Sequence, residues 1–145
     1  MGKHAYAAEK AWLDELQGGR RRLDALTNQA LSIRETAERV TAIMSESGIV
    51  THNQTSRVEN GAVKLVDLAQ TVDRAAARLA DMIQDRREVI DEVTDAKLWE
   101  LLTLRYIDGK PWGQVARAMN YDRRWTLCLH VQALAALHRV RADST

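Results

Sequence analysis

The chain has 145 residues, 46% of them hydrophobic and 28% charged, which is ordinary for one folded domain or for a compact unit with an extended one. One proline, seven glycines and no phenylalanine argue against a β-rich or loop-rich fold and favour long helices. No apolar run reaches the length of a membrane span, no apolar signal core is present, and a single cysteine gives no disulfide framework, so we expect a cytoplasmic protein.

The net charge of +1 is unevenly distributed along the chain. From Leu101 onward there are seven basic and three acidic residues, whereas the first hundred residues carry fourteen basic and seventeen acidic ones. Proteins that bind nucleic acid concentrate positive charge on the part that meets the phosphates. The asymmetry modestly favours a basic C-terminal module on an acidic stem.

Two long segments show the apolar spacing that is typical of paired helices. Over residues 9–45, apolar or small side chains recur at alternating three- and four-residue intervals. Gly18-Gly19 interrupts this spacing and leaves three alternatives open: a kink, a close helix crossing or a break into two helices. A second helix is expected over residues 61–94, and the polar stretch 46–60 predicts the connection. Each helix would be about 50–55 Å long, so residues 1–94 predict an antiparallel hairpin.

A second apolar stripe accompanies the seam of the second predicted helix at seven-residue intervals. Because a lone hairpin buries one seam per helix, the stripe predicts a further partner, and we favour a second copy in a four-helix bundle over contact with the C-terminal module. The residues predicted to mediate oligomerisation are Leu68, Ala75, Leu79, Met82 and Val89. Arg86 falls where the seam requires an apolar residue.

Residues 95–145 predict a second domain of three helices joined by two tight connections, the helix-turn-helix pattern. Asp108-Gly109 would end the first of these helices, and Pro111 suits the first turn of the second, which ends near Met119. Asn120 suits a left-handed helix end, and Asp122 can cap the third helix.

The runs RYIDGKPWGQVA and YDRRWTLCLHVQAL resemble the promoter-reading domain of bacterial sigma factors. More closely, the chain resembles a family of small phage proteins in which a long helical hairpin precedes a sigma-like C-terminal domain. The matching residues are Arg105, Tyr106, Gly109, Trp112, Val115, Ala116, Tyr121, Arg124, Trp125, Leu129, His130, Ala133 and Leu134, together with the run Glu59–Leu68. The resemblance implies DNA binding in a phage or prophage regulatory role.

In such a domain the N-terminal residues of the third helix reach base edges in the major groove, where arginine pairs with guanine. One face of this helix is assigned to the core: Trp125, Cys128, Leu129, Gln132, Ala133, Ala136 and Leu137. The residues predicted to contact DNA are Arg123, Arg124, Thr126, Leu127 and His130 in the groove, and Lys110, Gln114 and Arg117 at the phosphates.

No glycine-rich phosphate loop, activated nucleophile or set of metal ligands is recognisable, so neither catalysis nor a cofactor nor a metal is expected. We expect an all-α protein that binds double-stranded DNA sequence-specifically as a dimer and regulates phage transcription. One alternative is a DNA-recognition subunit for genome packaging, similar to a small terminase subunit. The other is a sigma-like adaptor that binds RNA polymerase or another protein without reading DNA.

Overall fold

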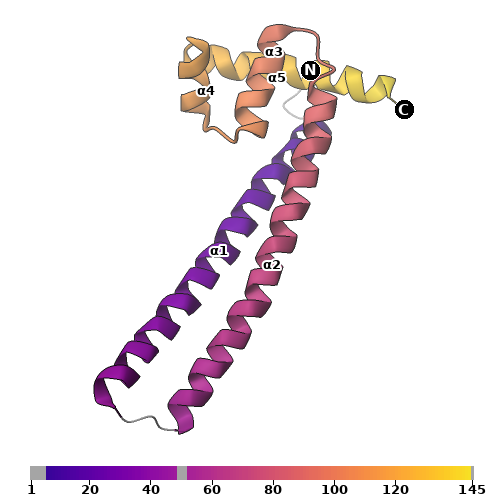
Figure 1. Cartoon of the computed structure of the whole chain (residues 1–145). Helices are drawn as coiled ribbons and strands as arrows, with labels where there is room; N and C mark the ends of the chain where they lie inside the picture. Colours follow the sequence, from indigo (N-terminus) through magenta and orange to yellow (C-terminus); the bar gives the residue numbers. More distant parts are fainter. Residues whose placement is uncertain (1–5, 49–51, 145) are drawn as a thin grey trace. The chain divides into compact units, whose positions relative to one another are not determined.

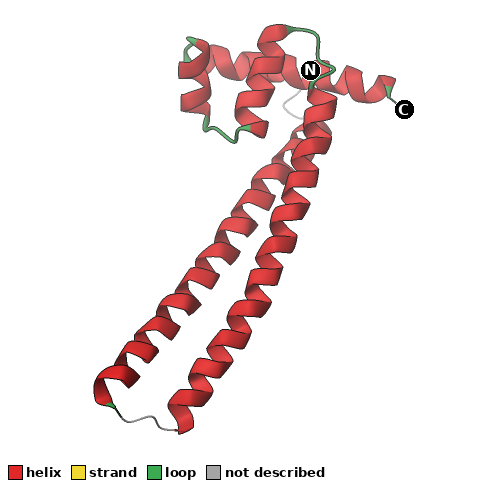
Figure 2. Cartoon of the chain, viewed as in Figure 1, coloured by secondary structure: helices red, strands yellow, loops and turns green. Residues whose placement is uncertain are grey.

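The computed structural model describes residues 6–48 and 52–144. Apart from short turns and connections, this part of the chain is helical and contains no strand, which confirms the predicted all-α class (Figure 2). In chain order the elements are α1 (Ala7–Ser47), α2 (His52–Ile90), α3 (Ala96–Leu102), the π-helical turn η1 (Thr103–Ile107), α4 (Trp112–Met119) and α5 (Arg123–Asp143).

The chain divides into two compact units. The head unit contains residues up to Gly19 and from Leu79 onward, and the arm unit contains Arg20–Arg78. The start of α1 and the end of α2 therefore belong to the same unit as α3, α4 and α5. The domain boundary predicted between residues 94 and 95 falls inside the head unit.

In the arm unit, α1 and α2 run side by side in opposite directions (Figure 1). The predicted long connection over residues 46–60 is wrong, since α1 continues to Ser47 and α2 begins at His52. Polar residues lower helix propensity by only a few tenths of a kcal/mol each, so a polar stretch need not leave the helix. The local stop signal is Gly48, whose φ of +64° lies in the left-handed region that ends helices.

Helix α1 runs without interruption through Gly18-Gly19, so of the alternatives left open there the break into two helices is excluded. A Cβ built on Gly19 would lie 2.9 Å from Cδ1 of Leu79, whereas one on Gly18 would meet nothing within 4 Å. Gly19 thus allows α1 and α2 to approach closely within the head unit. Helix α2 ends at Ile90, four residues before the predicted position, and a short turn leads to Asp95.

The core of the head unit draws on all its elements. Each fully buried leucine or isoleucine contributes about 1.5–3 kcal/mol relative to an exposed one, so this cluster dominates the stability of the unit. Its buried members are Leu13 and Leu16 from α1; Ile90 and Val93 from α2 and the turn after it; Leu98, Leu101, Leu102, Tyr106 and Ile107 from α3 and η1; and Val115, Met119, Leu129, Ala133, Leu134 and Leu137 from α4 and α5.

Asp95 caps the start of helix α3, because its carboxylate accepts hydrogen bonds from the backbone N–H groups of Lys97 and Leu98, at 3.0 and 3.2 Å. Trp99 on α3 is 38% exposed, and its indole N–H donates to Asp91 at 2.9 Å. The π-helical turn that follows widens the helix, so that Tyr106 and Ile107 are both buried. Gly109, at a φ of +71°, then reverses the chain as predicted.

Helix α4 starts one residue later than predicted, with Pro111 as its cap instead of its first residue. The carbonyl oxygen of Pro111 accepts from the N–H groups of Gln114 and Val115, both at 3.0 Å. Asn120 has a φ of +59°, which confirms the expected left-handed end of α4. Three residues separate α4 from α5, as the sequence predicts.

Candidate nucleic-acid interface

The turn between α4 and α5 fixes the first residues of α5. The Asp122 carboxylate accepts from the backbone N–H of Trp125 at 2.6 Å, which confirms the predicted cap. Arg123 and Arg124 follow directly and are exposed. Within the described chain, neither guanidinium lies within 4.0 Å of a carboxylate, so both charges are available to an external anion.

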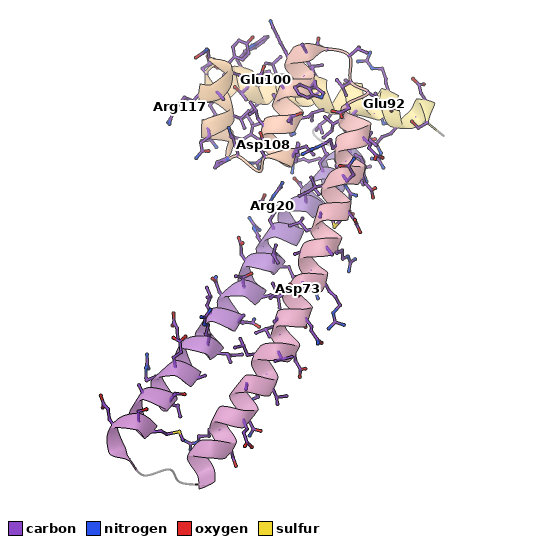
Figure 3. All side chains as sticks on the ribbon, viewed as in Figure 1. Arg20, Asp73, Glu92, Glu100, Asp108 and Arg117 are labelled. Atoms are coloured by element: carbon purple, nitrogen blue, oxygen red, sulfur yellow. The ribbon has the colours of Figure 1, made fainter. Side chains whose placement is uncertain are left out.

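Two of the residues predicted to contact phosphates lie on the outer surface of α4. Gln114 and Arg117 are exposed, and Figure 3 shows the Arg117 side chain on the outer side of the helix. Lys110 is half-buried in the preceding connection, where its carbonyl oxygen accepts a hydrogen bond from Arg105 at 3.1 Å. Gln114 and Arg117 therefore join the arginines of α5 as exposed polar groups of the head unit.

The predicted outward position of Thr126 and His130 is wrong. Thr126 is fully buried and its hydroxyl donates to the carbonyl oxygen of Asp122 at 2.8 Å, while His130 is 7% exposed. The buried face of α5 consists of Thr126, Leu129, His130, Ala133, Leu134 and Leu137. It is rotated by about one residue, or 100°, from the predicted face, so Trp125, Cys128 and Gln132 are exposed.

His130 belongs to a buried cluster that joins η1, α4 and α5. Its Nε2 lies 2.7 Å from the Tyr106 hydroxyl, and the Trp112 ring meets it edge-on with centroids 4.5 Å apart. Burial lowers the pKa of His130 to about 4, helped by the positive charges of Lys10 and Arg105. Burial likewise raises the pKa of Tyr106. With both groups neutral, the Tyr106 hydroxyl and Nε2 of His130 share one hydrogen bond, whose direction is set by the imidazole tautomer.

The exposed side of α5 also carries apolar side chains. Leu127 is 41%, Val131 55% and Trp125 47% exposed. Arg124, Leu127 and Val131 are spaced by three and four residues and therefore share one face of the helix. The surface is thus a mixture of free arginines and large apolar groups.

A second arginine cluster, centred on Trp12, holds the two ends of the chain together within the head unit. The guanidinium groups of Arg86 and Arg141 lie 4.6 and 4.3 Å from the centroid of the Trp12 ring. Arg86 is buried, donates to the backbone carbonyl of Trp12 at 3.2–3.3 Å, and pairs with Glu15. The sequence signal for this cluster was the cation at position 86 in an apolar seam.

Glu9 extends the Trp12 cluster toward the C-terminal end of α5. Its carboxylate lies 2.8 Å from His138 Nδ1 and 3.9 Å from Arg141. Burial acts to raise the pKa of Glu9, but the hydrogen bond with His138 and the nearby positive charges outweigh it, so the net direction is downward. The beginning of α1 is therefore fixed to the end of α5 by charged as well as aromatic contacts.

The residues predicted to mediate oligomerisation fall in both units. Leu79 is 8% exposed and packs beside Gly19, while Met82 and Val89 pack against the core of the head unit. Leu79 is buried by contacts within one chain, which corrects its predicted role, whereas the role of the partly buried Met82 and Val89 stays a prediction. Leu68 and Ala75 are half-buried in the arm unit, and their role stays a prediction.

In the described residues, no three histidine, cysteine, aspartate or glutamate side chains are placed to hold a metal ion. None of the described helices has the length and apolar character needed to cross a membrane. No protein-family model, curated protein or solved structure matches the chain.

Proposed function

We propose that the protein binds double-stranded DNA sequence-specifically through the first turns of α5 and acts as a phage transcriptional regulator in the cytoplasm of the host. The observation that carries the proposal is the pair Arg123 and Arg124, exposed, without carboxylate partners and held at the start of a capped helix. A short turn with a left-handed Asn120 precedes it, and the sigma-like resemblance of this segment supports the same function.

An α-helix fits the major groove of B-DNA, where arginine donates two hydrogen bonds to O6 and N7 of guanine. Arg124 shares its helix face with Leu127, which suits contact with a neighbouring thymine methyl group. The sequence placed Arg123 in the groove, but it lies about 100° around α5 from Arg124, so we reassign it to a phosphate contact. The phosphate contacts, which orient the helix without reading sequence, are then assigned to Arg123, Arg117, Gln114 and Lys110. A homodimer would read two half-sites at a fixed separation.

The test is DNA binding by the full-length protein as a function of salt. A duplex is first selected from a random pool, and its affinity is then measured by fluorescence anisotropy between 50 and 300 mM salt. Contacts to three or four phosphates predict a slope of about −3 in log K against log salt. A weak interaction that is indifferent to salt and to sequence would overturn the proposal.

A protein adaptor is the second candidate, because Trp125, Leu127 and Val131 give α5 an exposed apolar surface. RNA polymerase is the partner that the sigma-like resemblance suggests. Apolar contacts depend only weakly on salt, so binding to the polymerase without affinity for DNA would favour this candidate. A packaging role would instead require a ring of many subunits.

A further inference from the structure

The two units differ sharply in how far they bury their side chains. Every buried residue of the described chain, from Glu9 to Leu137, belongs to the head unit. In the arm unit no described side chain is buried, and even the residues of its helix–helix seam are half-exposed. The arm unit therefore has a seam but no closed core.

Such a unit lacks the burial that normally stabilises long helices. Fixing a residue costs roughly 1–2 kcal/mol of backbone conformational entropy, and most helix stability in proteins comes from packing of an apolar face. A half-exposed leucine gains only part of the roughly 1.5–3 kcal/mol that full burial provides. Additional apolar contacts from outside the chain are therefore needed to stabilise the two helices of the arm unit.

The exposed apolar side chains mark where such contacts would form. Four large ones lie in the arm unit, and all fall in the half farther along the helices from the head residues, between residues 30 and 69: Leu31, Ile43, Val63 and Val66, which are 50–61% exposed. Val63 and Val66 are three residues apart on α2 and form one ridge, flanked by Ala62 and Ala69.

The same half of the arm unit contains an open groove between α1 and α2. Its volume is about 470 Å³ and its lining is mostly small or aliphatic: Ala37, Thr41, Ala42, Ser45 and Leu65, with Arg34 and Glu38 at its edge. Arg34 and Glu38 neutralise each other at 3.2 Å. Small residues let a second helix approach closely. The groove accordingly fits a narrow aliphatic ridge.

We infer that the occupant of this groove is a second copy of the chain and that the protein is a homodimer through the described residues 30–47 and 52–69 of the arm unit. The chain itself carries both the groove and a ridge of the required size, so two copies related by a two-fold axis satisfy each other. The inferred dimer would be a four-helix bundle, and it holds whether or not the head unit binds DNA.

Charge supports this choice of occupant. Residues 30–69 carry four basic and five acidic side chains, a net charge of −1, so two such surfaces meet with little repulsion. The remainder of the arm, residues 20–29 and 70–78, carries five arginines and two aspartates, a net charge of +3, and would repel its own copy more strongly. Self-association is therefore favoured in the half that is nearly neutral and apolar.

The available surface is of the right order for a stable dimer. Residues 30–47 and 52–69 each extend about 27 Å as helix, and two helices side by side are about 20 Å wide. The face is therefore roughly 500 Å² in projection, which is of the same order as the roughly 800 Å² of accessible surface that each partner buries in a standard interface.

The experiment compares the full-length protein with Val66→Asp and with the matched control Gln70→Asp, which adds the same charge at an exposed polar position of α2. Sedimentation equilibrium between 1 and 100 μM gives the mass and the dissociation constant. We expect a dimer for the wild type and the control, and at least a hundredfold weaker association for Val66→Asp. A wild-type monomer at 100 μM, a larger closed ring, or unchanged association of Val66→Asp would overturn the inference.

A second measurement covers the case in which Val66→Asp loses arm structure. The melting temperature of a dimer rises with protein concentration, because association stabilises the folded state by mass action. We expect the wild-type arm transition, followed by circular dichroism, to shift upward over a hundredfold concentration range. A transition that does not depend on concentration would contradict the dimer. A dimer that fails to bind DNA would disprove only the proposed function.

Discussion

His130 shows how a polar residue can belong to a core. Its side chain is buried, its Nε2 shares a hydrogen bond with the Tyr106 hydroxyl, and the Trp112 ring meets it in an edge-on contact. Because Nε2 is hydrogen-bonded inside the core, its burial costs less than that of an unpaired nitrogen would. In sequence it is indistinguishable from an exposed histidine on a DNA-reading helix.

The lowered pKa of His130 predicts acid sensitivity. In the folded protein the pKa of His130 is about 4, whereas its ordinary pKa is 6.5. Between these pH values the unfolded chain therefore binds a proton that the folded chain does not. Unfolding therefore becomes easier as the pH falls below 6.5, by about 2 kcal/mol from pH 7 to pH 5, whereas above 6.5 the contribution vanishes.

Urea unfolding at several pH values and one protein concentration checks this expectation. His130→Gln cannot titrate, so its free energy of unfolding should change less over the same interval, although its stability at pH 7 is lower. An equal pH dependence in both proteins would show that other groups are responsible.

The proposed function makes its most specific prediction for Arg124. If it pairs with guanine, Arg124→Ala should weaken binding to the selected duplex by about 1–3 kcal/mol and leave affinity for random DNA nearly unchanged. Arg139→Ala, which removes another exposed arginine of α5, is the control. Equal losses on specific and random DNA would make Arg124 a phosphate contact.

At the scale of the helix, the two adjacent glycines of α1 provide a matched pair. Gly18→Ala adds a methyl group in open space and should raise the free energy of unfolding by about 0.5–1 kcal/mol through helix propensity. In Gly19→Ala the new methyl group must also displace the end of the Leu79 side chain, so the free energy of unfolding should rise by less than in Gly18→Ala or should fall. Thermal unfolding of the two variants tests this, and an equal increase in stability in both would contradict the close approach of α1 and α2.

Helix caps and apolar spacing predicted most elements correctly, because both depend on nearby residues. Asp122 and Asn120 mark the α4–α5 turn without knowledge of the fold. The extent of α1 and α2 was less predictable, since residues 46–60 are polar yet mostly helical. The face of α5 depends on partners from other elements, as with Thr126 and His130, and spacing alone does not reveal those partners.

At the scale of the whole chain, the Trp12 cluster joins sequence ends that the predicted boundary at residue 94 assigned to separate domains. Arg141→Ala removes a guanidinium 4.3 Å from the Trp12 ring and 3.9 Å from Glu9. Because the site is partly exposed, we expect a loss of about 1 kcal/mol in the free energy of unfolding. Chemical denaturation measures it, with Arg139→Ala as the neutral control. No loss would show that the cluster contributes little.

The head unit contains both the beginning and the end of the described chain, so the arm unit is topologically an insertion that leaves at Gly19 and returns at Leu79. In an insertion of this kind, the length of the arm can change without a change in the core of the head. Matched losses or gains of seven residues on each helix preserve the seam spacing and leave the head core unchanged. Related chains could therefore differ in arm length while retaining the same head, and arm length could evolve independently of what the head recognises.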